Sequence, residues 1–120
     1  MANIVSLLIF TTTLAVGQLL FKQVGLSLRG RPLVSGMLSI TQEPAFYLAL
    51  VLYGFATLLW IWILARVPLM QAYPWVAIGI ALVPLLSWFV FDERVTPVFW
   101  LGVAFIMAGV LLTQLGASTR

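Results

Sequence analysis

The chain has 120 residues, of which 63% are hydrophobic and only 8% are charged. Soluble domains carry about 25% charged residues, so this composition predicts a membrane protein. The formal net charge of +3 comes from basic residues scattered at the ends of apolar runs, which excludes the continuous basic stripe of a nucleic-acid-binding protein. The sequence has no Cys and no His, which excludes disulfides and the usual zinc ligand sets, and we expect neither metal nor cofactor.

Four apolar runs are each about as long as a membrane-spanning helix, and they cover residues 3–24, 45–64, 69–91 and 97–115. A bilayer core accepts only helices or closed barrels, and these runs lack the period-two alternation of barrel strands. The sequence therefore predicts an all-α fold in which residues 1–120 form a single bundle of four transmembrane helices.

The connections between the runs differ in length, and only the first, residues 25–44, is long. Its apolar residues fit one face of a short helix on the membrane surface, and an irregular loop is the alternative. The side of the membrane that holds the first and third loops has four basic residues, and the other side has two. The four are Lys22, Arg29, Arg31 and Arg94, and the two are Arg66 and Arg120. This excess predicts that both termini lie outside, with dual insertion as the alternative. Labelling of a Cys at Ser27 only from outside would overturn this orientation.

The first run carries a polar stripe, because Thr11, Gln18 and Lys22 are seven and four residues apart and so share one helical face. A lysine near the bilayer centre costs about 2.5–3.5 kcal/mol, so it either snorkels to the interface or has an anionic partner. Two interpretations of Lys22 are open. It snorkels, or it faces a cavity with Gln18 and binds a phosphate or another anion.

The third run is interrupted by prolines at positions 68, 74 and 84, which remove backbone donors and free carbonyl groups. In transporters, interrupted helices lie where backbone and polar side chains line a cavity. Gln71 and Tyr73 are suitably placed for such a cavity, although kinks that only improve packing are an equal alternative.

The three acids all lie outside the apolar runs. Glu43 is in the first loop, and Asp92 and Glu93 begin the third. A proton-coupled antiporter normally needs a carboxylate within its cavity, so that route is not available here. We expect Asp92, Glu93 and Arg94 to form a solvated cluster at a helix end.

In the fourth run, Gly102, Gly109 and Gly116 recur every seven residues, with Thr113 close to the same stripe. Small residues allow helices to approach closely, so the stripe predicts a helix-packing or dimer face. Four short helices can scarcely enclose a pathway for a sizeable solute, which also points to a dimer.

Three segments together resemble the drug/metabolite transporter superfamily, specifically its four-helix members: "GQLLFK" at Gly17–Lys22, "ARVPLMQAYP" at Ala65–Pro74 and "DERVTPVFWLGVAFIMAGVLL" at Asp92–Leu112. The last segment is similar to the closing stretch of an EamA-type repeat. In the small multidrug resistance branch, proton exchange uses a first-helix glutamate eight positions before a lysine, and Leu14 stands at that position here. The paired subunits of the aminoarabinose-phosphoundecaprenol flippase lack that glutamate and have the "GQ" and "AYP" segments, so the chain resembles them more closely.

This resemblance implies transport of a polyprenyl-phosphate-linked sugar across the bacterial inner membrane, by a homodimer or by a heterodimer with a paralogous four-helix subunit. Lys22 would then hold the phosphate, Gln18 and Thr11 would hold phosphate or sugar oxygens, and Gln71 and Tyr73 would line the headgroup cavity. An exporter of small cations and a non-transporting assembly subunit are the alternatives. An enzyme is least expected, because no nucleophile, base and orienting group can be assembled from these residues.

Overall fold

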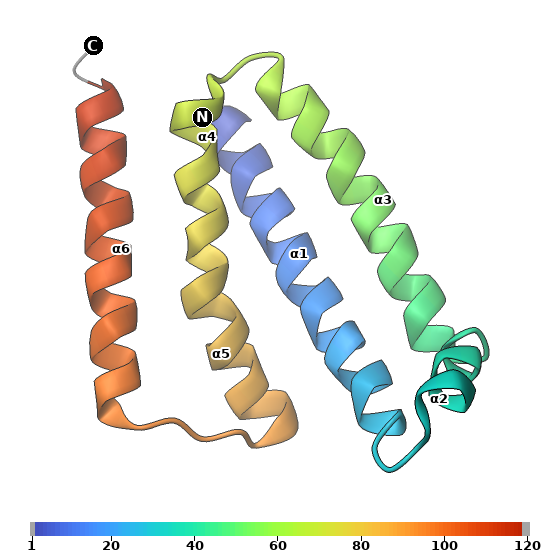
Figure 1. Ribbon diagram of the computed structural model, residues 1–120. Helices are drawn as coiled ribbons and strands as arrows, with labels where there is room; N and C mark the ends of the chain where they lie inside the picture. Colours follow the sequence, from blue (N-terminus) through green and yellow to red (C-terminus); the bar gives the residue numbers. More distant parts are fainter. Residues whose placement is uncertain (1, 119–120) are drawn as a thin grey trace.

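The computed structural model describes residues 2–118, and this part of the chain contains helices and no strand (Figure 1). Three helices are continuous and long enough to cross a membrane: α1 (Ala2–Ser27), α3 (Pro44–Leu64) and α6 (Pro97–Ser118). A fourth candidate span, Leu69–Phe91, is built from three shorter pieces. The prediction of an all-α protein with four membrane-spanning helices is confirmed.

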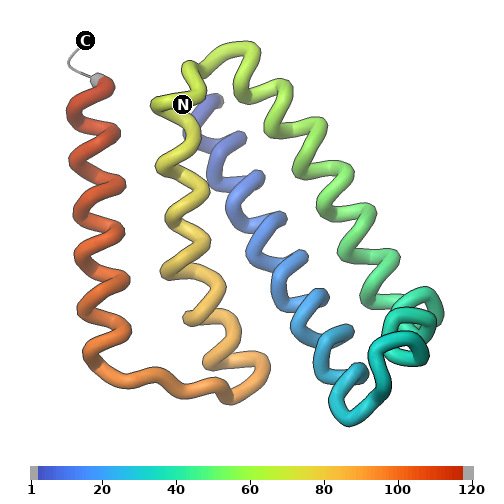
Figure 2. Tube along the Cα trace, viewed as in Figure 1, coloured from blue at the N-terminus to red at the C-terminus, as the bar shows by residue number. Residues whose placement is uncertain are grey.

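The four spans lie side by side in the order α3, α1, α4 with α5, and α6 (Figures 1 and 2). The molecule is correspondingly flat, with extents of 53 × 36 × 21 Å. The helix α1 is flanked on both sides, whereas α3 and α6 form the two edges. In the third and fourth spans only 6% of the most apolar window is buried within the chain. Most of their surface is therefore left for lipid or for a partner.

The third span consists of α4 (Leu69–Ala72), the 3₁₀ segment η1 (Tyr73–Ile78) and α5 (Gly79–Phe91). Pro74 lies in η1 and Pro84 lies inside α5, and neither can donate a backbone hydrogen bond. In η1 the backbone N–H groups bond nearer along the chain than in an α-helix, and the N–H of Gly79 reaches the carbonyl of Val76. The predicted interruption is therefore present around Pro74, whereas α5 continues through Pro84 without a break.

The tightest packing in the chain joins α1 to α3. Three residues of α3 at a spacing of seven are fully buried at this contact: Ala49, Ala56 and Ile63. On α1, Phe10 is buried and its ring stacks on that of Trp60 at 4.7 Å between centroids. Small side chains let two membrane helices approach closely, so van der Waals contact stabilises this pair.

The long first connection contains a helix, α2 (Leu33–Ile40), so the helical alternative for this segment is the one observed. Gly30, with φ at 77°, ends the turn that leaves α1, in a conformation that glycine adopts without strain. The predicted apolar face is exposed on this helix: Leu33, Val34, Met37 and Leu38. A short helix of this kind, at the end of the spans, suits the membrane surface.

Candidate functional site

Two residues of the polar stripe of α1 form hydrogen bonds with neighbouring helices. The hydroxyl of buried Thr11 donates to the backbone carbonyl of Trp75 at 3.3 Å, in the 3₁₀ segment of the third span. The amide of Gln18 donates to the hydroxyl of Tyr53 on α3. One side chain thus contacts each of the two helices that flank α1, and both contacts are polar.

Thr11 and Gln18 also line a common hollow of about 210 Å³ between α1 and the third span. The other residues of its lining are mostly apolar or small: Leu14, Ala15, Val76, Gly79, Ile80 and Val83. Leu14 is the position at which the multidrug branch would have its glutamate. The hollow therefore offers hydroxyl and amide groups and no carboxylate among these lining residues.

Lys22 lies one turn beyond Gln18 and has an anionic partner. Its Nζ is 3.1 Å from Oε2 of Glu93, which follows α5, and both side chains are about half exposed, at 38% and 46%. Glu93 is exposed at the end of α5 together with Asp92 and Arg94, as expected for a solvated group, but its carboxylate pairs with Lys22 of α1. Asp92 and Arg94 do pair with each other at 3.6 Å and are largely exposed.

The left-handed backbone conformation of Asp92 directs Glu93 toward α1. Asp92 caps α5 with φ at 55°, a region that Asp tolerates better than most residues, and its N–H donates to the carbonyl of Ser87. The N–H of Glu93 reaches the same carbonyl at 3.4 Å. This cap reverses the chain at the end of the third span, and the reversal brings the carboxylate of Glu93 to Lys22.

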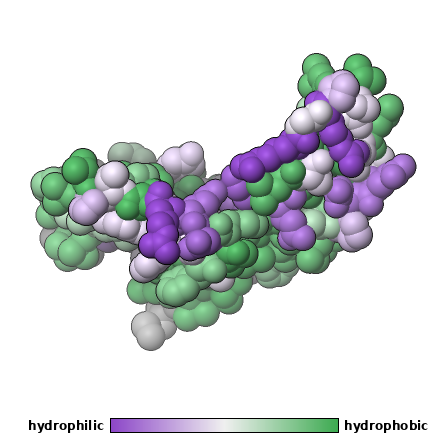
Figure 3. Space-filling model, turned by 90° about the horizontal axis from the view of Figure 1, so that it is seen from below, coloured by the Kyte–Doolittle hydropathy of each residue, from purple (hydrophilic) through white to green (hydrophobic). Residues whose placement is uncertain are grey.

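The Lys22–Glu93 pair lies at the more charged end of the molecule. In Figure 3, which views this end from below, hydrophilic residues (purple) form a band across it. Charged residues of the first and third connections and of the adjoining helix end gather there: Lys22, Arg29, Arg31, Glu43, Asp92, Glu93 and Arg94. This end therefore offers four basic and three acidic side chains to a ligand that approaches from water.

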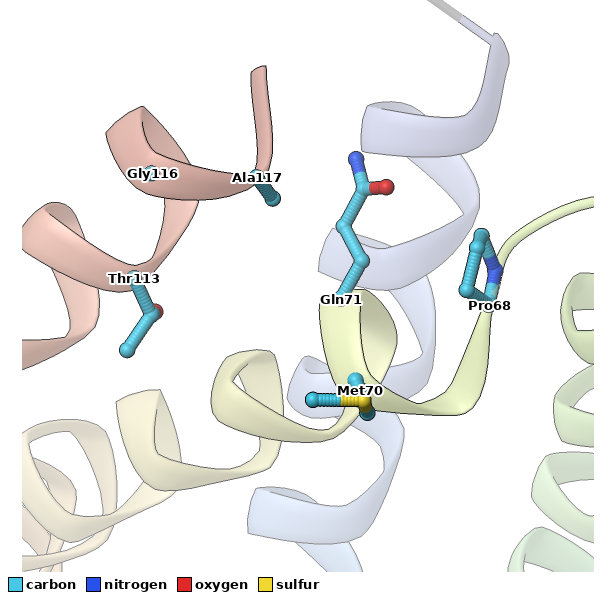
Figure 4. Close-up of a pocket in the computed structure, with 6 residues that line it drawn as sticks. All are labelled: Pro68, Met70, Gln71, Thr113, Gly116 and Ala117. Atoms are coloured by element: carbon cyan, nitrogen blue, oxygen red, sulfur yellow. The ribbon is translucent and has the colours of Figure 1, made fainter. Parts of the chain in front are cut away.

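Gln71 lies elsewhere, at the opposite end of the third span. It lines a pocket of about 540 Å³ between α4 and α6, with Thr113 and Gly116 across from it (Figure 4). The amide of Gln114 donates to the backbone carbonyl of Gln71 at 3.0 Å and ties α6 to α4. Tyr73 is exposed, and its ring lies in a T-shaped arrangement with that of Trp60 on α3, with centroids 6.4 Å apart.

The five predicted binding residues therefore fall into separate places. Thr11 and Gln18 share one hollow, Lys22 lies beyond them at the charged end, and Gln71 lies in another pocket. Tyr73 is among the lining residues of neither pocket.

Sequence reasoning missed three polar partners of these residues, namely Tyr53, Glu93 and Gln114. A signal existed for Tyr53, because Phe46, Tyr53 and Trp60 recur every seven residues along one face of α3. Gln114 was visible as an amide within an apolar run. For Glu93 there was no signal, because its direction depends on the backbone of Asp92.

One end of the glycine stripe of α6 lies beside the pocket of Gln71. Gly116 and Thr113 line the pocket that faces Gln71. Gly102, Gly109 and Gly116 are all exposed, and a Cβ atom added to any of them would meet nothing within 4 Å. Gly102 and Gly109 are not among the lining residues of that pocket. The part of the stripe nearer the start of α6 is therefore open to close approach by another helix.

Comparison with known proteins finds relatives that cover nearly the whole chain. A protein from Salmonella paratyphi C described as a probable 4-amino-4-deoxy-L-arabinose-phosphoundecaprenol flippase subunit ArnE is 35% identical over 106 residues, 88% of this chain and 91% of its own. A protein of the same description from Salmonella newport is 35% identical over 107 residues, 88% of this chain and 92% of its own. One from Hamiltonella defensa is 46% identical over 59 residues, 49% of this chain and 53% of its own.

No family model and no solved structure matches the chain. The relatives are nevertheless similar enough, over enough of their length, to establish the family. The multidrug exporter branch is not favoured by any of these descriptions. The chain belongs to the family of 4-amino-4-deoxy-L-arabinose-phosphoundecaprenol flippase subunits.

Proposed function

We propose that this chain is one subunit of a transporter that moves undecaprenyl-phosphate-linked aminoarabinose across the bacterial inner membrane. The observation that carries this function is the 35% identity, over 88% of the chain, to flippase subunits of that description. The four candidate spans fit a protein that works within a bilayer. The relatives are described as transporter subunits, and the same class of activity is proposed here.

Lys22 is the proposed partner of the lipid phosphate. A phosphate that leaves water needs compensating charge and hydrogen bonds, because an isolated anion is very costly in an apolar medium. The amine of Lys22 is half exposed at the charged end of α1, where a headgroup can reach it. Gln18 lies one turn further into the membrane, and its amide keeps a second N–H beyond the one bonded to Tyr53.

Thr11, Gln71 and Tyr73 mark the rest of the proposed headgroup path. Thr11 lies deeper in the hollow of Gln18, and Gln71 lies in the pocket at the opposite end. These hollows, of about 210 and 540 Å³, suit a headgroup rather than a long polyprenyl chain. The tail would therefore stay in lipid beside the subunits while the headgroup crosses.

A second four-helix subunit, identical or paralogous, completes the proposed transporter. The flat row of helices leaves α6 as an edge with exposed Gly102 and Gly109. Close approach of another helix at this face buries surface that the chain alone leaves open.

Replacing Gly109 by leucine is expected to shift the protein from dimer to monomer. The added side chain meets open space within the chain, so it leaves the helices of one subunit in place and obstructs only a neighbouring subunit. The mass measured by light scattering in mild detergent checks this. Gly54→Leu is the matched control, because Gly54 is also exposed in a span with nothing within 4 Å of its Cβ position. Equal dimer fractions for both variants would place the interface elsewhere.

Native mass spectrometry of the protein, purified gently from its own host, tests the proposed function. We expect a dimer or a complex with a paralogous subunit that retains a lipid with the mass of a polyprenyl-phosphate aminosugar. A lipid-free homodimer that retains a small cation would instead support the exporter. A large complex with an unrelated protein and no lipid would support an assembly subunit.

A further inference from the structure

The Lys22–Glu93 ion pair raises the question of what a partly exposed acid does beside the proposed phosphate ligand. An anionic neighbour 3.1 Å away competes with phosphate for the amine, so a site built only for an anion would be better without it. The carboxylate is placed there by the left-handed cap at Asp92, which determines the course of the chain after α5. Its position therefore follows from the fold of this segment.

The headgroup named in the relatives' description bears an amino group as well as a phosphate. An alkyl amine is protonated at neutral pH, so such a headgroup is zwitterionic. Resting on the proposed function, we propose that Lys22 and Glu93 form one site for this zwitterion. Lys22 binds the phosphate, and Glu93 binds the ammonium group of the sugar.

Charge balance supports this assignment. When a zwitterionic headgroup enters, one ion pair is replaced by two, and each protein charge keeps an opposite charge beside it. A headgroup with a phosphate and no amine binds Lys22 but leaves Glu93 without a cationic partner at the membrane surface. The site therefore favours aminated lipids over neutral sugar lipids, because only they compensate both protein charges.

The exposure of the pair suits an exchangeable contact. Ion pairs that are about half exposed contribute little to stability, so a ligand can separate Lys22 from Glu93 at low cost. Residues 92–97 are all exposed, which leaves the carboxylate reachable from the water side of the membrane.

Glu93 is the acid best placed for this role. Asp92 faces Arg94, and Glu43 precedes α3 without a side-chain hydrogen bond to that helix end. Among the three acids of the chain, Glu93 is thus the one whose carboxylate contacts the basic residue of the polar stripe on α1.

The test measures binding of two lipids to the purified transporter, with its partner subunit where one is present. One lipid is a polyprenyl phosphate that carries the aminosugar, and the other has a hydroxyl group in place of the amine. We expect the intact protein to bind the amine lipid about fivefold more tightly, which is the size of effect that one partly exposed ion pair can give. Glu93→Gln is expected to remove this preference, because it weakens binding of the amine lipid and leaves binding of the hydroxyl lipid equally tight or tighter.

Glu43→Gln is the matched control, since it removes an acid from the same end of the molecule and is expected to keep the fivefold preference. Lys22→Gln is expected to weaken binding of both lipids, because both carry the phosphate. A preference that survives Glu93→Gln, or that is equally lost in Glu43→Gln, would overturn the role of Glu93. Tight binding of both lipids without any preference refutes this inference alone, whereas failure of the intact protein to bind either lipid refutes the proposed function as well.

Discussion

Replacing Lys22 by glutamine is expected to lower the initial rate of lipid exchange between leaflets by at least about tenfold. The substitution keeps the length and polarity of the side chain but removes the charge that we assign to the phosphate. A hydrogen bond to a charged group contributes about 1.5–3 kcal/mol, and each 1.4 kcal/mol is a factor of ten in binding. The rate in vesicles that contain equal amounts of inserted protein checks this.

Two further variants separate charge from folding. Lys22→Arg keeps the positive charge and is expected to retain most of the rate, although its planar fork contacts a phosphate differently. Glu93→Gln removes the other half of the ion pair. It is expected to leave membrane insertion and the free energy of unfolding unchanged, because the pair is half exposed. If correctly inserted Lys22→Gln exchanged lipid at the normal rate, Lys22 would be only a structural partner of Glu93 and an interfacial lysine.

Replacing Gly17 by alanine is expected to destabilise the contact between α1 and α3. A Cβ atom at this position would lie only 2.5 Å from Cε2 of Tyr53, well inside van der Waals contact. The ring of Tyr53 also stacks on Phe21, with centroids 5.1 Å apart, and accepts the hydrogen bond of Gln18, so its displacement disturbs both contacts. Overpacking of this kind costs about 1–3 kcal/mol, measurable as a lower free energy of unfolding in a detergent titration.

The matched control for this packing prediction is Gly25→Ala on the same helix, where the added atom has nothing within 4 Å. Alanine favours helix more than glycine does, so this variant is expected to be neutral or slightly stabilising. Tyr53→Ala in the Gly17→Ala background makes room for the added methyl group, and the two substitutions are expected to be non-additive. Equal stability of the two glycine variants would show that the ring of Tyr53 moves aside without cost.

The architecture could be predicted from sequence because it depends on strong local signals. Runs of about twenty apolar residues specify membrane helices. The prolines of the third run predict that this span is interrupted, and the interruption lies at Tyr73–Ile78 around Pro74. The order of the helices in the row could not be predicted, because it depends on which surfaces fit one another. The closest packing uses Ala49 and Ala56 on α3, whereas the small-residue pattern that the sequence shows most clearly is the glycine stripe of α6.

The candidate site was predictable to a smaller extent. The helical period alone places Thr11, Gln18 and Lys22 on one side of α1, and the first two do share a hollow. The period of one helix gives no position relative to another helix, so it could not show that Gln71 lies in a different pocket. Nor could it show that a left-handed Asp92 turns Glu93 toward Lys22, since a single backbone angle leaves no pattern in the sequence.

Transfer of the lipid itself is the most direct evidence for a flippase. The purified transporter, with its partner subunit where one is present, is placed in vesicles that carry polyprenyl-phosphate aminoarabinose in one leaflet, and appearance of the sugar amine in the other leaflet is followed with an impermeant amine reagent. We predict protein-dependent transfer that is slowed by Lys22→Gln. Transfer no faster than in protein-free vesicles, in a preparation shown to be inserted and fully assembled, would contradict a flippase function for this chain.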